Sequence, residues 1–110
     1  MGWQVIDGRT EYMVNPLGLD ERAPRFFWKL QSNDRDASQS AYRILVASSP
    51  EALGRDEGEL WDSGKVASDR TAHVAYDGKP LQSEGKYYWK VRSWNRGGIA
   101  SDWSEINYWT

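Results

Sequence analysis

Cysteine is absent from the 110 residues of this chain. A disulfide framework, a thiolate metal site and a cysteine nucleophile are therefore excluded. Histidine occurs once, as His73, which rules out a metal site built from several histidines. Neither glycine-rich phosphate-binding pattern, G-x-G-x-x-G or G-x-x-x-x-G-K, is present. Taken together, these absences lead us to expect no metal and no cofactor.

An excess of charge of one sign and a long apolar run are also missing. The 14 basic and 16 acidic residues are scattered and give a net charge of −2, which does not favour nucleic acid as a partner. No apolar stretch approaches the roughly 20 residues needed to span a bilayer, so no membrane partner is expected. The first residues lack the basic start and apolar stretch of a signal peptide, and the compartment stays open.

Aromatic residues, in contrast, are dense: seven Trp, six Tyr and two Phe. A chain of this length forms one domain and buries roughly 65 % of its unfolded surface, enough for one core. It is too short for a catalytic (β/α)₈ barrel, which needs about 250 residues. The composition therefore indicates large flat side chains that fill a core or meet a partner.

Turn-forming pairs divide the chain into short segments rich in aromatic and β-branched residues, a pattern that predicts an antiparallel all-β domain. We expect a tail at 1–8 and one domain at 9–110. One helical turn is predicted at Ser49–Leu53, with Ser49 as its cap and Gly54 at its end. The seven predicted strands are Arg9–Val14, Arg25–Gln31, Ala41–Ser48, Leu60–Ser63, Ala72–Tyr76, Tyr87–Asn95 and Ile106–Trp109.

Alternation within these strands separates an apolar face from a face that carries the charges. Two sheets with one apolar face each must pack together, which predicts a seven-stranded antiparallel β-sandwich of the fibronectin type III or immunoglobulin kind. The inward sets are Phe26, Trp28 and Leu30; Tyr42, Ile44 and Val46; and Tyr87, Trp89, Val91 and Ser93. We expect Trp28, Tyr42, Tyr87 and Trp89 to form the core.

The outward residues of Tyr87–Asn95 are the best candidates for a contact surface. Tyr88, Lys90, Arg92 and Trp94 form a stripe of rings and cations, and Trp103 is placed to stack between Lys90 and Arg92. Three interpretations stay open: a self-contained structural ladder, an interface with a neighbouring domain, or a platform for sugar stacking. The predicted contact residues are Tyr88, Arg92, Trp94 and Trp103, with Trp3, Phe27 and Trp61 as further candidates for exposure.

Catalytic residues are not expected in this chain. Asp34 and Asp36, and likewise Asp56, Glu57 and Glu59, fall in predicted loops, where carboxylates are solvated and lack the environment that tunes a catalytic acid. His73 alternates with inward-facing residues and is expected at the surface. The nucleophile-elbow pattern G-x-S-x-G does not occur.

Two local patterns resemble features of fibronectin type III domains. The spacing Leu81–Tyr87 resembles the tyrosine corner, in which a buried Tyr hydrogen-bonds to upstream backbone, and Trp28 resembles the core tryptophan of that fold. The segment Asp102–Glu105 resembles half of the Trp-Ser repeat of cytokine-receptor domains. Without a Cys pair, the antibody-type variant of the sandwich is disfavoured.

A longer series of segments is similar to the N-terminal fibronectin type III-like domain of bacterial α-L-rhamnosidases. These segments are Asn15–Asp20, Pro24–Leu30, Gln39–Pro50, Leu60–Val66, Tyr87–Trp94 and Asp102–Glu105. The resemblance implies that catalysis in that family occurs in a downstream (α/α)-barrel domain. Acidic residues of that barrel invert the anomeric centre when they remove terminal α-L-rhamnose. No position here matches that catalytic motif.

The resemblance thus implies a non-catalytic accessory domain that packs against, or spaces, other domains of the same polypeptide. The alternatives are a carbohydrate-binding module that uses exposed aromatic rings, and a free-standing protein-interaction domain. Other domains of the same chain are the expected partners, with carbohydrate as the alternative partner.

Overall fold

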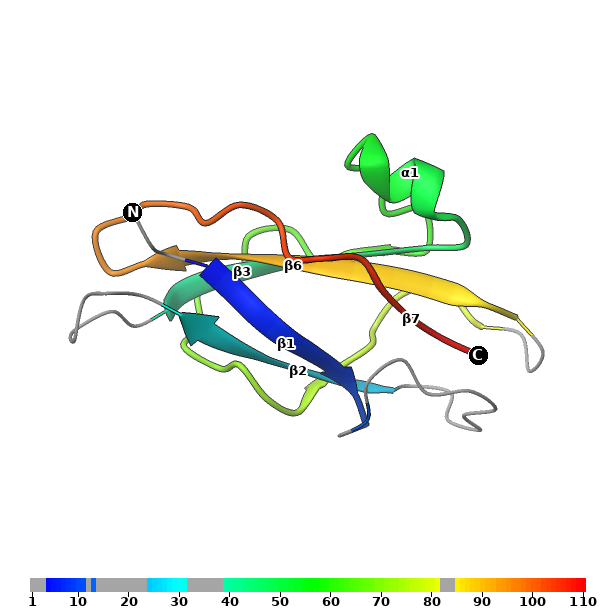
Figure 1. Cartoon of the computed structure of the whole chain (residues 1–110), viewed down its shortest axis with the longest axis horizontal. Helices are drawn as coiled ribbons and strands as arrows, with labels where there is room; N and C mark the ends of the chain where they lie inside the picture. The colour runs from blue at the N-terminus through cyan, green and yellow to red at the C-terminus, as the bar shows by residue number, and fades with distance from the viewer. Residues whose placement is uncertain (1–3, 12, 14–23, 32–38, 82–84) are drawn as a thin grey trace.

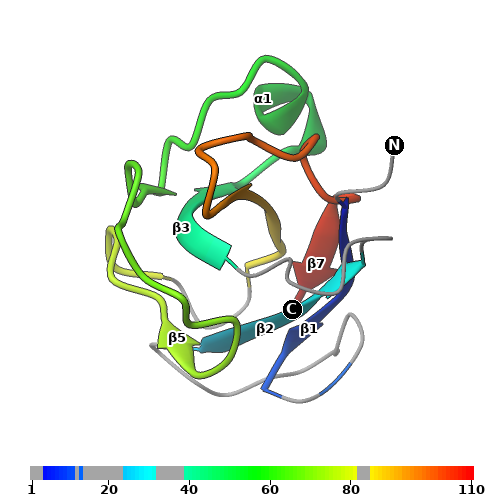
Figure 2. The same cartoon turned by 90° about the vertical axis from the view of Figure 1, so that its left-hand side faces the viewer.

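Two antiparallel sheets face each other in the computed structural model, which describes residues 4–11, 13, 24–31, 39–81 and 85–110 (Figure 1). The end view separates the two layers and places the single helix outside them (Figure 2). The three-stranded sheet has the order β1 (Gln4–Thr10), β2 (Arg25–Gln31), β5 (Val74–Ala75). The four-stranded sheet has the order β4 (Trp61–Asp62), β3 (Gln39–Ala47), β6 (Tyr87–Asn95), β7 (Asn107–Trp109). The predicted β-sandwich is confirmed.

The first strand lies earlier in the chain than the alternation predicted. Strand β1 runs from Gln4 to Thr10, so the predicted start of the strand at Arg9 is wrong, and part of the predicted tail belongs to the sheet. Residues 12 and 14 of the predicted strand lie outside the described residues. The register with β2 shifts between Ile6 and Arg9, where Asp7 adopts a φ of 52°. Such a shift breaks the two-residue period, and pairing with β2 rather than apolar alternation defines the strand. By contrast, β2 and β6 have the predicted bounds.

Gly8 lets the edge of the three-stranded sheet approach the edge of the other sheet. A Cβ atom at this position would overlap the amide of Asn107 in β7 and lie 3.3 Å from the Trp89 ring. A side chain here would require the Asn107 amide to move aside and would crowd the Trp89 ring. Glycine at the register shift therefore leaves room for both side chains where β1 passes β7.

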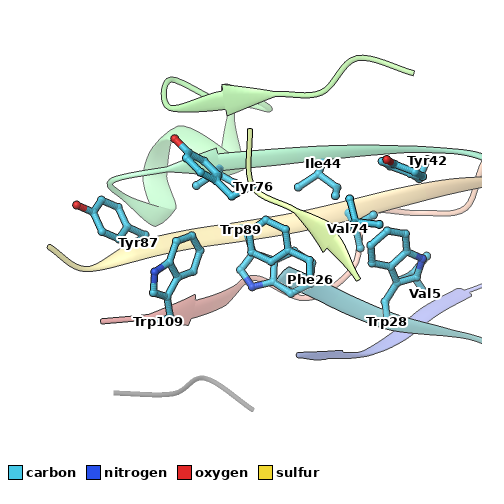
Figure 3. Packing of buried hydrophobic residues seen from close by; sticks show 12 residues of the cluster. Val5, Phe26, Trp28, Tyr42, Ile44, Val74, Tyr76, Tyr87, Trp89 and Trp109 are labelled. Atoms are coloured by element: carbon cyan, nitrogen blue, oxygen red, sulfur yellow. The ribbon is translucent and has the colours of Figure 1, made fainter. Parts of the chain in front are cut away.

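Aromatic rings from both sheets fill the space between them (Figure 3). The Phe26 and Trp89 rings, both fully buried, lie 4.6 Å apart between centroids, and Trp109 lies 5.6 Å from Phe26. At the other end, Trp28 meets Tyr42 edge to face at 5.4 Å. The four residues expected in the core, Trp28, Tyr42, Tyr87 and Trp89, are all buried there.

Two of the core indoles, those of Trp28 and Trp89, donate their N–H groups to the opposite sheet. Trp28 Nε1 donates to Gln39 Oε1 at 3.0 Å, and Trp89 Nε1 donates to Thr10 Oγ1 at 3.1 Å. The Gln39 amide, itself buried, donates in turn to the carbonyls of Ser68 and Arg70 at 3.0 and 2.6 Å. Buried polar groups are tolerated only with such partners, so these bonds fix how the two layers sit.

Helix α1 (Pro50–Gly54) covers part of the outer face of the four-stranded sheet and creates a second, smaller core. Ser49 caps it as predicted, because its Oγ accepts from Ala52 N at 3.3 Å, and the helix ends at Gly54 as predicted, with Arg55 as the C-cap. Leu53 packs on Leu45, which is outward-facing but fully buried. The outer face of β3, which the alternation assigned to the charged side of the strand, is thus covered at Leu45. No helix of the described residues is long and apolar enough to cross a membrane.

The tyrosine corner is described only in part, because residues 82–84 lie outside the described residues. The Tyr87 ring is buried and packs directly against Gly85. A second tyrosine, Tyr76, bonds to backbone within the described residues: its hydroxyl lies 2.5 Å from the Lys79 carbonyl. Burial raises the pKa of Tyr76 to about 12, so the hydroxyl remains a donor.

Replacing Gln39 should destabilise the fold far more than replacing a glutamine on the surface. Gln39→Leu leaves the Trp28 N–H and two loop carbonyls without their partner, and each orphaned buried group costs about 1–3 kcal/mol. Urea unfolding, followed by tryptophan fluorescence, measures the loss. The matched control is Gln31→Leu, an exposed position on β2, where the change stays within about 0.5 kcal/mol. Equal stability of the two variants would contradict the tie between the sheets.

Candidate functional site

The outer face of the four-stranded sheet gathers aromatic rings and cations. We call this set the aromatic–cation ladder. Its members come from β3, β6, β7 and the loops beside them. They are the rings of Tyr88, Trp94, Trp103 and Tyr108 and the cations of Arg43, Lys65, Lys86, Lys90 and Arg92.

Trp103 is the centre of the ladder. Lys90 Nζ lies 4.5 Å and Arg92 Cζ 4.8 Å from the centroid of its ring, which confirms the predicted stacking. Arg43 adds a third cation at 5.9 Å. Sequence reasoning missed Arg43, because only the register that pairs Arg43 with Arg92 brings it under the ring. Each exposed pair of this kind contributes roughly 0.5–1 kcal/mol.

Two serines hold the Trp103 segment against β6. Ser101 Oγ accepts from the N–H of Ser93 at 3.2 Å, and Ser104 Oγ accepts from the N–H of Val91 at 3.0 Å. The N–H groups of both serines donate at 2.8 Å to the carbonyls of the same two β6 residues. The serine hydroxyls thus replace strand carbonyls as acceptors, and Trp103 between them lies over the sheet. The Trp-Ser pair is visible in the sequence, but these roles of the two serines are not.

The ladder has two further clusters, one at each end of β6. Tyr88 lies 6.3 Å from Tyr108, and Lys86 Nζ lies 4.5 Å from the Tyr108 ring. At the other end, Lys65 Nζ lies 4.9 Å from the Trp94 ring. Alternate residues on a strand are about 6.6 Å apart, so Tyr88 and Trp94 are separated by roughly 20 Å. The predicted contact residues share one face but do not form one continuous aromatic platform.

Two cations of the ladder form ion pairs with carboxylates. Lys90 is buried, and its Nζ lies 2.6 Å from Asp56 Oδ1. The hydrogen bond from Lys90 lowers the pKa of Asp56. Arg43 donates from two nitrogens to Asp62 at 3.0 and 2.6 Å, and that bond lowers the pKa of Asp62. Asp56 is an exposed loop carboxylate, as expected, and in addition it neutralises a buried ammonium, a role that the sequence did not predict.

The other carboxylates that the sequence places in loops do not share one partner or one site. Glu59 accepts from the Ser48 hydroxyl and N–H at 2.5 and 3.0 Å, so it too has a structural partner, whereas Glu57 is exposed and pairs with Arg55 at 3.4 Å. Asp34 and Asp36 lie outside the described residues. No group of three or more His, Cys, Asp or Glu side chains in the described ranges is placed to hold a metal ion.

The other aromatic candidates are also dispersed. His73 is exposed, as predicted, and its ring meets Phe27 edge to face at 5.0 Å on the three-stranded sheet. Trp61 is half-buried between Phe26, at 6.2 Å, and Tyr76, at 5.5 Å, so it belongs mainly to the core. Trp3 lies outside the described residues.

A groove of about 510 Å³ opens between β1 and the loop that leads into β7. Its lining combines carboxylates, amides and Trp103. The residues are Gln4, Val5, Ile6, Asp7, Gly8, Asp102, Trp103, Ser104, Glu105 and Asn107. Hydrogen-bonding groups beside an indole provide the chemistry for polar ligands that also have apolar faces.

Comparison with known proteins identifies relatives across nearly the whole chain. Residues 5–110 match the family described as the Rha78A-like, N-terminal immunoglobulin domain. An α-L-rhamnosidase of Streptomyces avermitilis is 43 % identical over 106 residues, which cover 96 % of this chain but 10 % of that protein. An α-L-rhamnosidase of Formosa agariphila is 40 % identical over 94 residues, which cover 86 % of this chain and 10 % of that protein. The chain therefore spans about a tenth of these relatives.

Solved structures agree with the sequence comparison. The α-L-rhamnosidase from Dictyoglumus thermophilum matches with a TM-score of 0.93 and 37 % identity over 96 % of this chain and 12 % of that one. The Streptomyces avermitilis α-L-rhamnosidase complexed with L-rhamnose matches with a TM-score of 0.92 and 42 % identity, over 97 % of this chain and 10 % of that one. The family description uses the immunoglobulin name rather than fibronectin type III, and both names denote related β-sandwiches.

Breaking the Asp56–Lys90 pair from its two sides should have unequal effects. Asp56→Asn leaves a buried ammonium without an anion and should cost about 1–3 kcal/mol, whereas Lys90→Met leaves no buried charge and should cost less. Urea unfolding at pH 7 measures both. Because the pKa of Asp56 is lowered in the folded state, the stability it contributes is lost as the pH falls below the ordinary value of 3.8. The difference between the wild type and Asp56→Asn should therefore shrink in acid, and a constant difference would contradict this role.

Proposed function

The chain belongs to the Rha78A-like N-terminal immunoglobulin domains, and from that premise we propose that it is a non-catalytic accessory domain of a longer α-L-rhamnosidase. The observation that carries this proposal is the unequal coverage. Nearly all of this chain matches about a tenth of each curated relative, so nine-tenths of such an enzyme lies outside the match. The activity of the longer protein would reside in that remainder.

The carboxylates of the domain support a structural role. Glycoside hydrolysis by inversion needs a general acid with a raised pKa beside a second carboxylate at about 6.5–9.5 Å. Here, every described carboxyl group with a resolved shift has a lowered pKa, and in each the largest cause is a hydrogen bond from a side chain of the domain. These groups are Asp7, Glu11, Asp56, Glu59 and Asp62. A lowered pKa keeps a carboxyl group ionised and unable to act as a general acid near neutral pH.

The accessory role is geometric. The indole–amide and indole–hydroxyl bonds between the sheets, together with α1 and the serine-anchored Trp103 segment, make the sandwich a rigid body. A rigid body can space or support neighbouring domains without contributing to the reaction. Other domains of the same polypeptide are therefore the partners that this function requires.

Carbohydrate binding is the second candidate function, and the groove between β1 and the 102–107 loop is the observation that favours it. Its carboxylates and amides could bond to sugar hydroxyls beside Trp103. The ladder itself is a poorer sugar platform than the sequence suggested. Each of its rings already stacks with a cation of the domain.

The purified 110-residue chain should not hydrolyse an aryl α-L-rhamnoside, whereas the longer protein that contains it should. Release of the aryl group, followed by absorbance, measures both, and the Streptomyces avermitilis α-L-rhamnosidase serves as the positive control. Turnover that scales with the concentration of the purified chain would contradict a non-catalytic role.

Carbohydrate binding in the groove would predict saturable shifts of backbone amide resonances at residues 4–8 and 102–107 when L-rhamnose is added up to tens of millimolar. The variant Glu105→Ala should weaken that response several-fold, and Glu57→Ala, exposed on another loop, is its control. Unchanged spectra over the whole titration would exclude this second function for rhamnose.

A further inference from the structure

We propose that the aromatic–cation ladder docks a carboxylate-bearing surface of another domain in the same longer polypeptide, with Arg92 and Trp103 at the centre of the contact. This inference rests on the proposed function, because that function supplies the neighbouring domain. It goes further by naming the face that is covered and the chemistry that covers it.

The two outer faces of the sandwich differ in how their cations are neutralised. On the three-stranded sheet, Arg25 makes two hydrogen bonds of 3.0 Å with Glu11. Asp7 accepts from Arg9 at 3.1 Å and lies 3.3 Å from Lys29. That face therefore supplies its own carboxylates.

The four-stranded sheet has carboxylates for only some of its cations. Asp62 pairs with Arg43, and Asp56 pairs with Lys90. Lys65, Lys86 and Arg92 stack on rings, and none of them forms an ion pair with a carboxylate in the part of the chain that the structure describes. These three cations lack an ion-pair partner among the described residues, and the exposed carboxylates Asp102 and Glu105 flank Trp103 on the same side.

Arg92 is the member best suited to recognise a partner. Its Nε is buried and has no hydrogen-bond partner. Its two terminal nitrogens do not belong to the buried atoms of the described residues that lack a partner. Trp103 lies 4.8 Å from the guanidinium carbon and limits the orientations of the group. An arginine held in place presents its remaining donors as a fork that fits a carboxylate in bidentate fashion.

The dimensions and composition of the face fit an interface between domains. From Tyr88 to Trp94 the ladder extends roughly 20 Å. This length is comparable with the width of a contact that buries about 800 Å² on each partner. Tryptophan, tyrosine and arginine are the residues most enriched among the anchors of such contacts. Lys65, Lys86 and Arg92, which have no ion-pair partner in the described residues, select a partner surface with carboxylates. The nine-tenths of the relatives beyond the match provides one source for such a surface.

Lysine labelling in the full-length polypeptide tests the docking face directly. A water-soluble acetylating reagent is added to the native protein and to the urea-unfolded protein, and mass spectrometry gives the ratio of labelling rates at each lysine. We expect Lys65 and Lys86 to be labelled at least five-fold more slowly, relative to the unfolded protein, than Lys29. Lys29 is the internal control, because its side chain is 72 % exposed on the opposite face.

A substitution then identifies the centre of the contact. Arg92→Gln should raise the labelling rates of Lys65 and Lys86 at least three-fold, whereas Arg9→Gln, on the three-stranded sheet, should leave them unchanged. Native-like α-L-rhamnosidase activity of both variants verifies that the polypeptide is folded.

The outcomes separate the two proposals. If the full-length polypeptide hydrolyses the rhamnoside but labels Lys65 and Lys86 as fast as Lys29, the docking inference is overturned and the accessory function stands. Protection that persists unchanged in Arg92→Gln overturns the central role of Arg92. If the gene encodes no catalytic region beyond this domain, the proposed function fails, and the docking inference fails with it.

Discussion

The burial of two indole N–H groups is the constraint on which the architecture depends. Large aromatic rings allow a cysteine-free chain of this size to fill the space between two sheets, but each buried tryptophan also brings a donor that must be satisfied. Trp28 finds Gln39 and Trp89 finds Thr10, and both acceptors stand on the opposite sheet. The same side chains that supply apolar area therefore also fix the relative position of the layers, a role that disulfides have in antibody domains.

Side chains pack against the inner face of the four-stranded sheet and against part of its outer face. Its inner face joins the aromatic core, while its outer face receives Leu53 from α1 and the ring of Trp103. Lys90 is buried under that cover and needs Asp56, which lies in the loop after the helix. Helix, loop and Trp103 segment thus depend on one another through a single buried cation.

The sequence was informative where one strand decides the outcome by itself. The bounds of β2 and β6, their inward residues and the stacking of Trp103 follow from the two-residue period and from composition. The predictions failed or were incomplete where a second strand decides. Strand β1 is defined by its register with β2, and Arg43 reaches Trp103 only through its pairing with Arg92. The roles of Ser101 and Gln39 depend likewise on residues that are distant in the sequence, which periodicity does not reveal.

The contrast between the two outer faces links this architecture to the role of the domain. A solvated face gains little from surface ion pairs, so a missing carboxylate costs little there. A face on which arginine and lysine are stacked on rings is different, because the rings restrict the side chains and reduce the entropy lost on binding. Carboxylates from a second domain would then meet donors that are already oriented. On the three-stranded sheet, Arg9, Arg25 and Lys29 instead pair with Asp7 and Glu11, so their donors are already engaged within the domain. Of the two outer faces, the four-stranded one is therefore the better suited to the neighbouring domain proposed above.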